Sequence, residues 1–225
     1  NFAFILMNDD LNKYPQIHFY FGDITFRKNE YKKALQHINN FKNTMDSKTN
    51  EKNSEDRDYY DNMTKYYRAM ISIYDVMGNI KKSIQFSKKY FNSVINEKIS
   101  LDPECVFAAF GTLELYGEWD YIKFLDKKNI LNGFGNFGFL PMDLYAKAII
   151  ADKNCESEIA LDYFLQIKEY ICNACDAPDA PNFNETWESL YQKIDDYNDF
   201  NIPNSEPPFG LFVDSKIKKL QKQIN

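Results

Sequence analysis

The chain has 225 residues, of which 44% are hydrophobic and 16% aromatic, more than a disordered chain carries and enough for a sizeable core. Only 8 glycines and 8 prolines are present, fewer than the turns of a β-sandwich or β-barrel need, so long helices are expected. The net charge of −6 disfavours nucleic acid as a partner, because an acidic surface repels phosphates.

The chain begins with Asn rather than Met, so we expect it to be a trimmed or processed piece. Residues 2–7, FAFILM, are interpreted as the end of a helix whose beginning is missing. This run is far shorter than the roughly 20 apolar residues that cross a bilayer, so no membrane insertion is expected. A cytoplasmic location is favoured, and a removed signal peptide remains an open alternative.

Four segments of the chain share one pattern, an apolar helix of about a dozen residues, a short turn and a second amphipathic helix. They cover residues 17–41, 66–90, 105–129 and 143–167. The expected turns lie at residues 28–30, 78–79, 117–118 and 153–156, where Asn and Gly can take the left-handed conformation that ends a helix. In each second helix one position is expected to cross its partner closely, and these positions are Ala34, Ser83, Ile122 and Ala160.

The pattern resembles tetratricopeptide repeats or a close helical-repeat relative. In the first segment Gly22, Tyr31 and Ala34 stand where that motif has its glycine, its turn aromatic and its small crossing residue. Ile122 departs from the motif, because it is larger than the usual crossing residue. The resemblance implies an all-α fold, an α-solenoid of stacked antiparallel helix pairs that forms a superhelix with a concave groove.

The expected domain organisation has two parts. Residues 1–175 are assigned to about four helix pairs, the first preceded by a partial helix, with a polar insertion at 45–58. Residues 176–225 are assigned to C-terminal capping helices and a loop, because a solenoid needs its last apolar face covered. Within this cap, helices are expected over 184–197 and 211–223.

Residues 132–141, NGFGNFGFLP, contain the G-x-G-x-x-G spacing of dinucleotide-binding loops. Such a loop must follow a strand and open a helix, whereas the helical periodicity of residues 119–131 predicts a helix before these glycines. We therefore expect no nucleotide cofactor. The favoured interpretation is a loop whose phenylalanines fill the core, and the alternative is a contact loop for a partner through Phe134 and Phe137.

Other chemical motifs are sparse. Cys172 and Cys175 form C-x-x-C, but no second such motif follows, and two semi-buried thiols are favoured over a metal or redox site. The two histidines, His18 and His37, lie far from these cysteines in sequence, which makes a metal cluster or a histidine-based triad improbable. We expect no catalytic residues, no metal and no cofactor.

A solenoid would bind its partner in the groove lined by the first helix of each pair. Lys65 and Arg68 are the strongest candidates, because they fall outside the apolar stripe of their helix and are three residues apart, so they are expected to share an exposed face. The full set of expected groove residues is Phe19, Asp23, Phe26, Lys65, Arg68, Asp75, Phe107, Glu114 and Tyr145.

The sequence thus supports three hypotheses about function. The first is a non-catalytic adaptor or scaffold that binds a protein or peptide partner through the groove. The second is an acidic helical inhibitor, such as a toxin-immunity protein, that binds through its outer surface. The third is an enzyme with an unrecognised site, which the absence of standard catalytic motifs disfavours.

Overall fold

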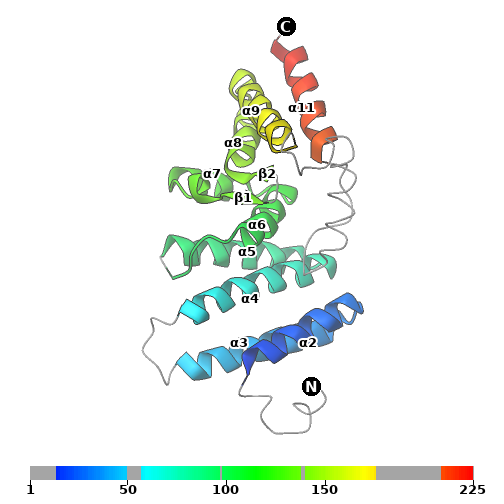
Figure 1. Ribbon diagram of the computed structural model, residues 1–225, viewed down its shortest axis with the longest axis vertical. Helices are drawn as coiled ribbons and strands as arrows, with labels where there is room; N and C mark the ends of the chain where they lie inside the picture. The colour runs from blue at the N-terminus through cyan, green and yellow to red at the C-terminus, as the bar shows by residue number, and fades with distance from the viewer. Residues whose placement is uncertain (1–13, 50–56, 97, 138–139, 176–208, 225) are drawn as a thin grey trace. The chain divides into compact units, whose positions relative to one another are not determined.

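A computed structural model describes residues 14–49, 57–96, 98–137, 140–175 and 209–224 (Figure 1). The described residues form an all-α fold with nine α-helices, as the sequence predicted. The helices are α2 (Pro15–Arg27), α3 (Tyr31–Thr49), α4 (Arg57–Val76), α5 (Ile80–Ile95), α6 (Pro103–Leu115), α7 (Trp119–Lys127), α8 (Met142–Lys153), α9 (Ser157–Cys175) and α11 (Phe209–Ile224).

The chain divides into two compact units. Unit 1 comprises the described residues up to 100 together with 108–116. Unit 2 comprises residues 101–107 and the described residues from 117 onward. Within the units neighbouring helices pack in pairs, and the further stacking of pairs into a solenoid remains a prediction, as does the domain boundary at residue 175.

In unit 1, α2 packs against α3 because small residues let the two backbones approach. Ala34 of α3 is fully buried, and a Cβ atom added to Gly22 of α2 would lie 2.6 Å from Cδ1 of Ile38. Asn29 ends α2 with a φ of 60°, the left-handed conformation expected at this turn. Both small residues of the motif therefore lie at the crossing that the sequence indicated.

The second pair of unit 1 is α4 with α5, and α4 also packs against α3. Ser83 occupies the crossing position, is fully buried, and donates a hydrogen bond from Oγ to the carbonyl oxygen of Ile71 at 3.3 Å. The hydroxyl is thereby satisfied inside the core, which explains why serine can replace alanine here. Tyr90 and Phe91 of α5 complete this core and are fully buried.

In unit 2, α9 packs against both α8 and α11. Ala160 lies at the crossing, and Phe164, Ile167 and Val213 belong to the shared core. The turn between α8 and α9 contains no glycine, and Cys155 takes the left-handed conformation with a φ of 62°. The last helix predicted from the sequence, 211–223, is confirmed as α11, while residues 2–7 and the helix expected over 184–197 lie outside the described residues.

The glycine-containing segment of unit 2 connects α7 with α8. A 3-10 helix, η2 (Leu131–Gly133), is followed by two short strands, β1 (Asn136–Phe137) and β2 (Leu140–Pro141), which pair antiparallel. The element before these glycines is therefore a helix, as the sequence predicted, and the βαβ setting of a dinucleotide loop does not occur in this segment.

Candidate protein-binding surface

Three large hydrophobic residues are exposed where α4 turns into α5. Val76 is 47% exposed, Met77 37% and Ile80 45%. The turn is set locally, because Gly78 takes a φ of 67° and the side chain of Asn79 accepts a hydrogen bond from the backbone N–H of Lys82 at 3.3 Å. The sequence signal for this site is the presence of apolar residues at a helix end, where polar ones are usual.

The end of α6 lies at the same place. Tyr116, the residue after α6, donates a hydrogen bond from its hydroxyl to Oδ1 of Asp75 at 2.7 Å. Burial, and then the hydrogen bond to Asp75, raise the pKa of Tyr116 to about 12, so the phenol stays protonated and remains a donor. Leu115, next to this tyrosine, is 51% exposed. We call Val76, Met77, Ile80 and Leu115 the turn patch.

Lysines border the turn patch on α5. Lys81 and Lys82 are exposed and directly follow Ile80 in the chain. The ammonium of Lys82 lies 5.2 Å from the ring centroid of Tyr74, and this ring stacks on Phe86 at 5.6 Å. The cation is thus held beside the apolar surface by a cation–π contact, and the patch combines hydrophobic side chains with positive charge.

The groove residues expected on α2 have partners within their own helix pair. The ring of Phe19 lies 5.3 Å from that of Phe41, and the ring of Phe26 lies 5.7 Å from that of Tyr31. Asp23 forms an ion pair with Arg27 at 2.9 Å on the same helix. All three candidate side chains are half-buried. Phe19 and Phe26 contact aromatic residues of α3, whereas Asp23 pairs with Arg27 within α2.

The expected pairing of Lys65 and Arg68 on one exposed face of α4 is wrong. Lys65 is exposed, but Arg68 is only 9% exposed. The reason is that α4 packs against both α3 and α5, so only a narrow strip of the helix faces solvent and a residue three positions from Lys65 already lies at the packed side. Asp75, a third candidate on this helix, is half-buried and accepts the hydrogen bond from Tyr116.

The remaining candidates fall on both units. Phe107 and Tyr145 of unit 2 and Glu114 of unit 1 are half-buried. Phe134 is 1% exposed, so its side chain is part of the core, as the favoured interpretation of the loop expected, and the alternative role as a contact residue is corrected for this position. The side chain of Phe137 lies outside the described part of the structure.

The two histidines lie next to each other, which sequence reasoning missed. The ring centroids of His18 and His37 are 6.2 Å apart, between α2 and α3, and Phe21 lies 5.5 Å from the ring of His37. Burial, and then the charge of His37, lower the pKa of His18, and burial lowers the pKa of His37. A signal existed: His18 lies 11 residues before Asn29 and His37 lies 8 residues after it, and an antiparallel helix pair brings positions on either side of its turn to within about one helical turn of each other.

The described residues provide neither a metal-binding cluster nor a membrane-spanning helix. No group of three or more histidine, cysteine or acidic side chains placed to hold a metal ion occurs among them. Cys172 and Cys175 lie in the last turn of α9, and their side chains are outside the described part. Within the described helices, none combines the length and the apolar character needed to cross a membrane.

The chain is acidic because of one segment. Residues 176–208 contain 8 acidic residues and 1 lysine, a net charge of −7 against −6 for the whole chain, which leaves +1 for the remainder. The described residues carry 24 basic and 19 acidic side chains, a net charge of +5, so their acidic surfaces are local patches rather than a general acidic field.

Comparisons with known proteins add no relative to this picture. No protein-family model, curated protein or solved structure matches the chain. The resemblance to tetratricopeptide repeats consequently rests on the residues quoted from the sequence and remains a prediction.

Proposed function

We propose that the protein is a non-catalytic interaction module that binds a protein partner through the turn patch. The observation that carries this proposal is the exposure of four large hydrophobic side chains, between 37% and 51%, around the hydrogen bond between Asp75 and Tyr116. Single exposed hydrophobic residues are ordinary, but a group gathered at one end of a folded unit is typical of a protein-binding surface.

The patch also indicates the chemistry of the partner. Lys81 and Lys82 border the apolar side chains, so the matching surface would offer hydrophobic anchors with carboxylates beside them. The flexible side chain of Met77 suits a partner of varied shape. This proposal keeps the protein or peptide partner that the sequence suggested for the groove and moves its main contact to the α4–α5 turn.

The groove of the tetratricopeptide-like arrangement stays a second proposed surface on the same module. Its support is Lys65, an exposed cation on α4, together with the half-buried aromatic residues Phe19 and Phe26 of α2. A non-catalytic role is supported by the position of His18 and His37, which lie between two packed helices beside another aromatic ring. Imidazoles held in this way are suited to packing rather than to proton transfer.

The alternative is an inhibitor that binds through an acidic outer surface. It is favoured by Glu158, Asp162 and Glu169, three exposed carboxylates along α9. Binding of this kind would depend strongly on ionic strength, because exposed charges are screened within about 8 Å at physiological salt. Binding through the turn patch would persist in high salt, because burial of hydrophobic surface carries it.

The test compares two matched variants of the full chain, Ile80→Glu and Ile159→Glu. Both isoleucines lie in the first turn of a helix, and they are 45% and 51% exposed. Proteins cross-linked to each variant in an extract of the native cells are quantified against those cross-linked to the unchanged chain. We expect partners that are retained by Ile159→Glu and lost by at least about tenfold with Ile80→Glu, in low and in high salt.

Circular dichroism checks that both variants keep their helical content. Equal recovery of every partner by the two variants, with equal helicity, would reject the turn patch. The inhibitor would be supported instead if partners were lost in two cases, when the charges of Glu158 and Asp162 are reversed and when the unchanged chain is tested in high salt.

A further inference from the structure

A stripe of acidic and apolar side chains runs along α9. Glu158, Asp162, Leu165 and Glu169 recur at intervals of four, three and four residues, which places them on one line of the helix. All four are exposed, and Leu165 is 44% exposed. The stripe therefore carries negative charge with one hydrophobic side chain near its middle.

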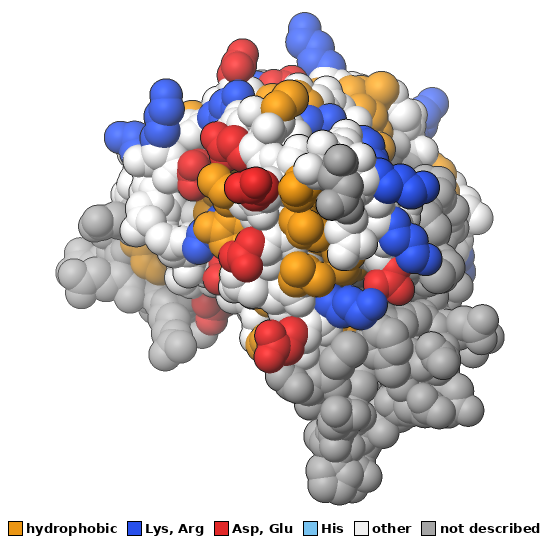
Figure 2. Space-filling model, turned by 90° about the horizontal axis from the view of Figure 1, so that it is seen from above, with side chains coloured by type: hydrophobic (Ala, Val, Ile, Leu, Met, Phe, Trp, Pro, Cys, Tyr) orange, Lys and Arg blue, Asp and Glu red, His pale blue; other side chains and the backbone are white. Residues whose placement is uncertain are grey.

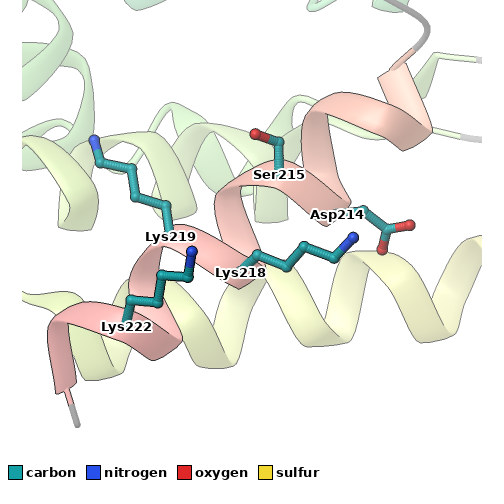
Figure 3. A pocket seen from close by; sticks show the side chains of 5 residues that line it. All are labelled: Asp214, Ser215, Lys218, Lys219 and Lys222. Carbon is teal, nitrogen blue, oxygen red and sulfur yellow. The ribbon is translucent and has the colours of Figure 1, made fainter.

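A stripe of lysines runs along α11. Lys218, Lys219 and Lys222 are exposed and fall on one side of the helix with Ser215. Figure 3 shows these side chains leaving the helix, with Asp214 one turn before Lys218. In the described part of the chain they line a shallow depression of about 460 Å³.

The two stripes lie on the same face of unit 2. Lys168 of α9 and Asp214 of α11 form an ion pair at 2.8 Å, and both side chains are partly exposed, so this pair marks the seam between the two helices at the surface. Leu165 stands three residues before Lys168, and Lys218 stands four residues after Asp214, so each stripe flanks the seam. Figure 2, which looks at the molecule from above, shows exposed hydrophobic side chains between acidic side chains and lysines.

The directions of the helices make this face self-complementary. Figure 1 shows α11 running back along α9, so the start of α9 lies beside the end of α11. Rotation of a second copy by 180° about an axis along the seam places α9 of each copy on α11 of the other. Glu158 then faces the partner's Lys222, and Asp162 faces the partner's Lys218. Glu158 and Asp162 are four residues apart, and so are Lys218 and Lys222. This spacing is about 6 Å along a helix on both sides, so the two contacts can form together.

We propose that the α9–α11 face binds a second copy of this chain in a two-fold symmetric dimer. This goes beyond the interaction proposed above, because it uses unit 2 and a different surface. A second copy fits better than a nucleic acid or an anionic membrane, because those would meet the carboxylates of α9 wherever they reached the lysines of α11. A second copy neutralises both stripes at once and covers Leu165.

The interface is small. The two helices have 19 and 16 residues, lengths of about 28 Å and 24 Å, so a face of two helices buries roughly 1,000 Å² in total, at the low end for a stable dimer. We therefore expect an association that depends on protein concentration and weakens with salt. Sedimentation velocity of the full chain over a range of concentrations should show a monomer–dimer equilibrium at about 20 mM salt that shifts to monomer at about 0.5 M salt.

Charge reversal tests the pairing directly. The variant Lys218→Glu, Lys222→Glu makes both stripes acidic, and the variant Glu158→Lys, Asp162→Lys makes both basic. Each alone should dimerise at least about tenfold more weakly than the unchanged chain. Mixed in equal amounts, they should form a one-to-one heterodimer, because each stripe then meets the opposite charge. Recovery in the mixture also shows that both variants are folded.

The matched control is Lys123→Glu, Lys127→Glu on α7, an exposed pair with the same spacing at the end of another helix. This control should dimerise like the unchanged chain. The proposal is overturned if the unchanged chain stays monomeric at low salt. That outcome is expected if the acidic residues 176–208 of the same chain bind the lysines instead. A mixture that stays monomeric, or a control as weak as the test variants, overturns it too.

Discussion

His18 of α2 and His37 of α3 lie with their ring centroids 6.2 Å apart, and the two ring nitrogens of His18 and Nδ1 of His37 have no hydrogen-bond partner among the described residues. His18 is only 8% exposed. Such a pair is stable while both rings are neutral, because a charged imidazole would lose hydration and repel its neighbour.

This arrangement predicts that the protein becomes less stable as the pH falls from about 7.5 to about 5.5. Both histidines have lowered pKa values in the folded state, so the unfolded chain binds protons first as the pH drops below its ordinary histidine pKa of about 6.5. The contribution of the two neutral histidines to the free energy of unfolding is complete above the unfolded pKa. It is lost as the pH falls through the lowered pKa values of the folded state. Urea unfolding at several pH values measures it.

The double variant His18→Phe, His37→Phe provides the comparison. It removes both titrating groups and keeps aromatic rings at the crossing of α2 and α3. Its denaturation midpoint should vary less between pH 7.5 and pH 5.5 than that of the unchanged chain. A pH dependence of equal size in the two proteins would assign the effect to other groups.

A second prediction concerns the close approach of α2 to α3. A Cβ atom at Gly22 would lie 2.6 Å and 2.9 Å from two side-chain carbons of Ile38, which is fully buried. Gly22→Ala gains about 1 kcal/mol of helix propensity but overpacks the crossing, which typically costs about 1–3 kcal/mol. We expect a net loss of about 1 kcal/mol in the free energy of unfolding, measured with urea.

Gly111 is the matched control for this substitution. It lies inside α6, and an added Cβ would meet nothing within 4 Å, so Gly111→Ala should stabilise the protein by about 0.5–1 kcal/mol. The combination of Gly22→Ala with Ile38→Val should recover part of the loss, because it removes one of the crowded carbons. Equal effects of alanine at the two glycines would contradict the close approach.

Much of the fold could be predicted because it is encoded locally. The turns after α2, α4 and α6 follow from Asn29, Gly78 and Gly117, each of which takes a positive φ. The crossing positions follow from helical spacing, and Ala34 and Ala160 are fully buried. These features depend on a few neighbouring residues, so a single sequence is sufficient to identify them.

The candidate site could be predicted less well, because exposure depends on neighbours that are distant in sequence. Arg68 is charged and outside the most apolar stripe of α4, yet the contacts of this helix on two sides bury it. The turn patch was missed because Val76, Met77 and Ile80 look like core residues, and only the assembled helix ends leave them exposed. The glycine-containing loop was interpreted correctly for Phe134, whose burial follows from its apolar side chain.

A third prediction is that Cys155→Gly stabilises the protein. Cys155 has a φ of 62° in the turn between α8 and α9 and its side chain is exposed. The left-handed conformation costs a side-chain-bearing residue about 1–2 kcal/mol, and glycine loses about 0.5–1 kcal/mol through its greater freedom in the unfolded chain. The expected net gain in the free energy of unfolding is about 0.5–1 kcal/mol. Cys155→Ala, which removes the thiol and keeps the strain, should give no such gain.

The last prediction concerns the hydrogen bond that joins the end of α6 to the end of α4. Tyr116 donates to Asp75 at 2.7 Å, and Tyr116→Phe removes the donor while keeping the ring. A hydrogen bond to a charged acceptor contributes about 1.5–3 kcal/mol, and the half-buried carboxylate can regain water, so we expect a loss of about 1–2 kcal/mol. Amide hydrogen exchange at Leu115 and Val76 should also become faster, because the two helix ends are no longer tied together. Tyr66→Phe is the control, since burial raises the pKa of that tyrosine to about 12 and its ring packs against those of Tyr67 and Phe86. A loss of equal size for Tyr66→Phe, or unchanged exchange at the turn patch in Tyr116→Phe, would show that the Asp75–Tyr116 bond does not order this surface.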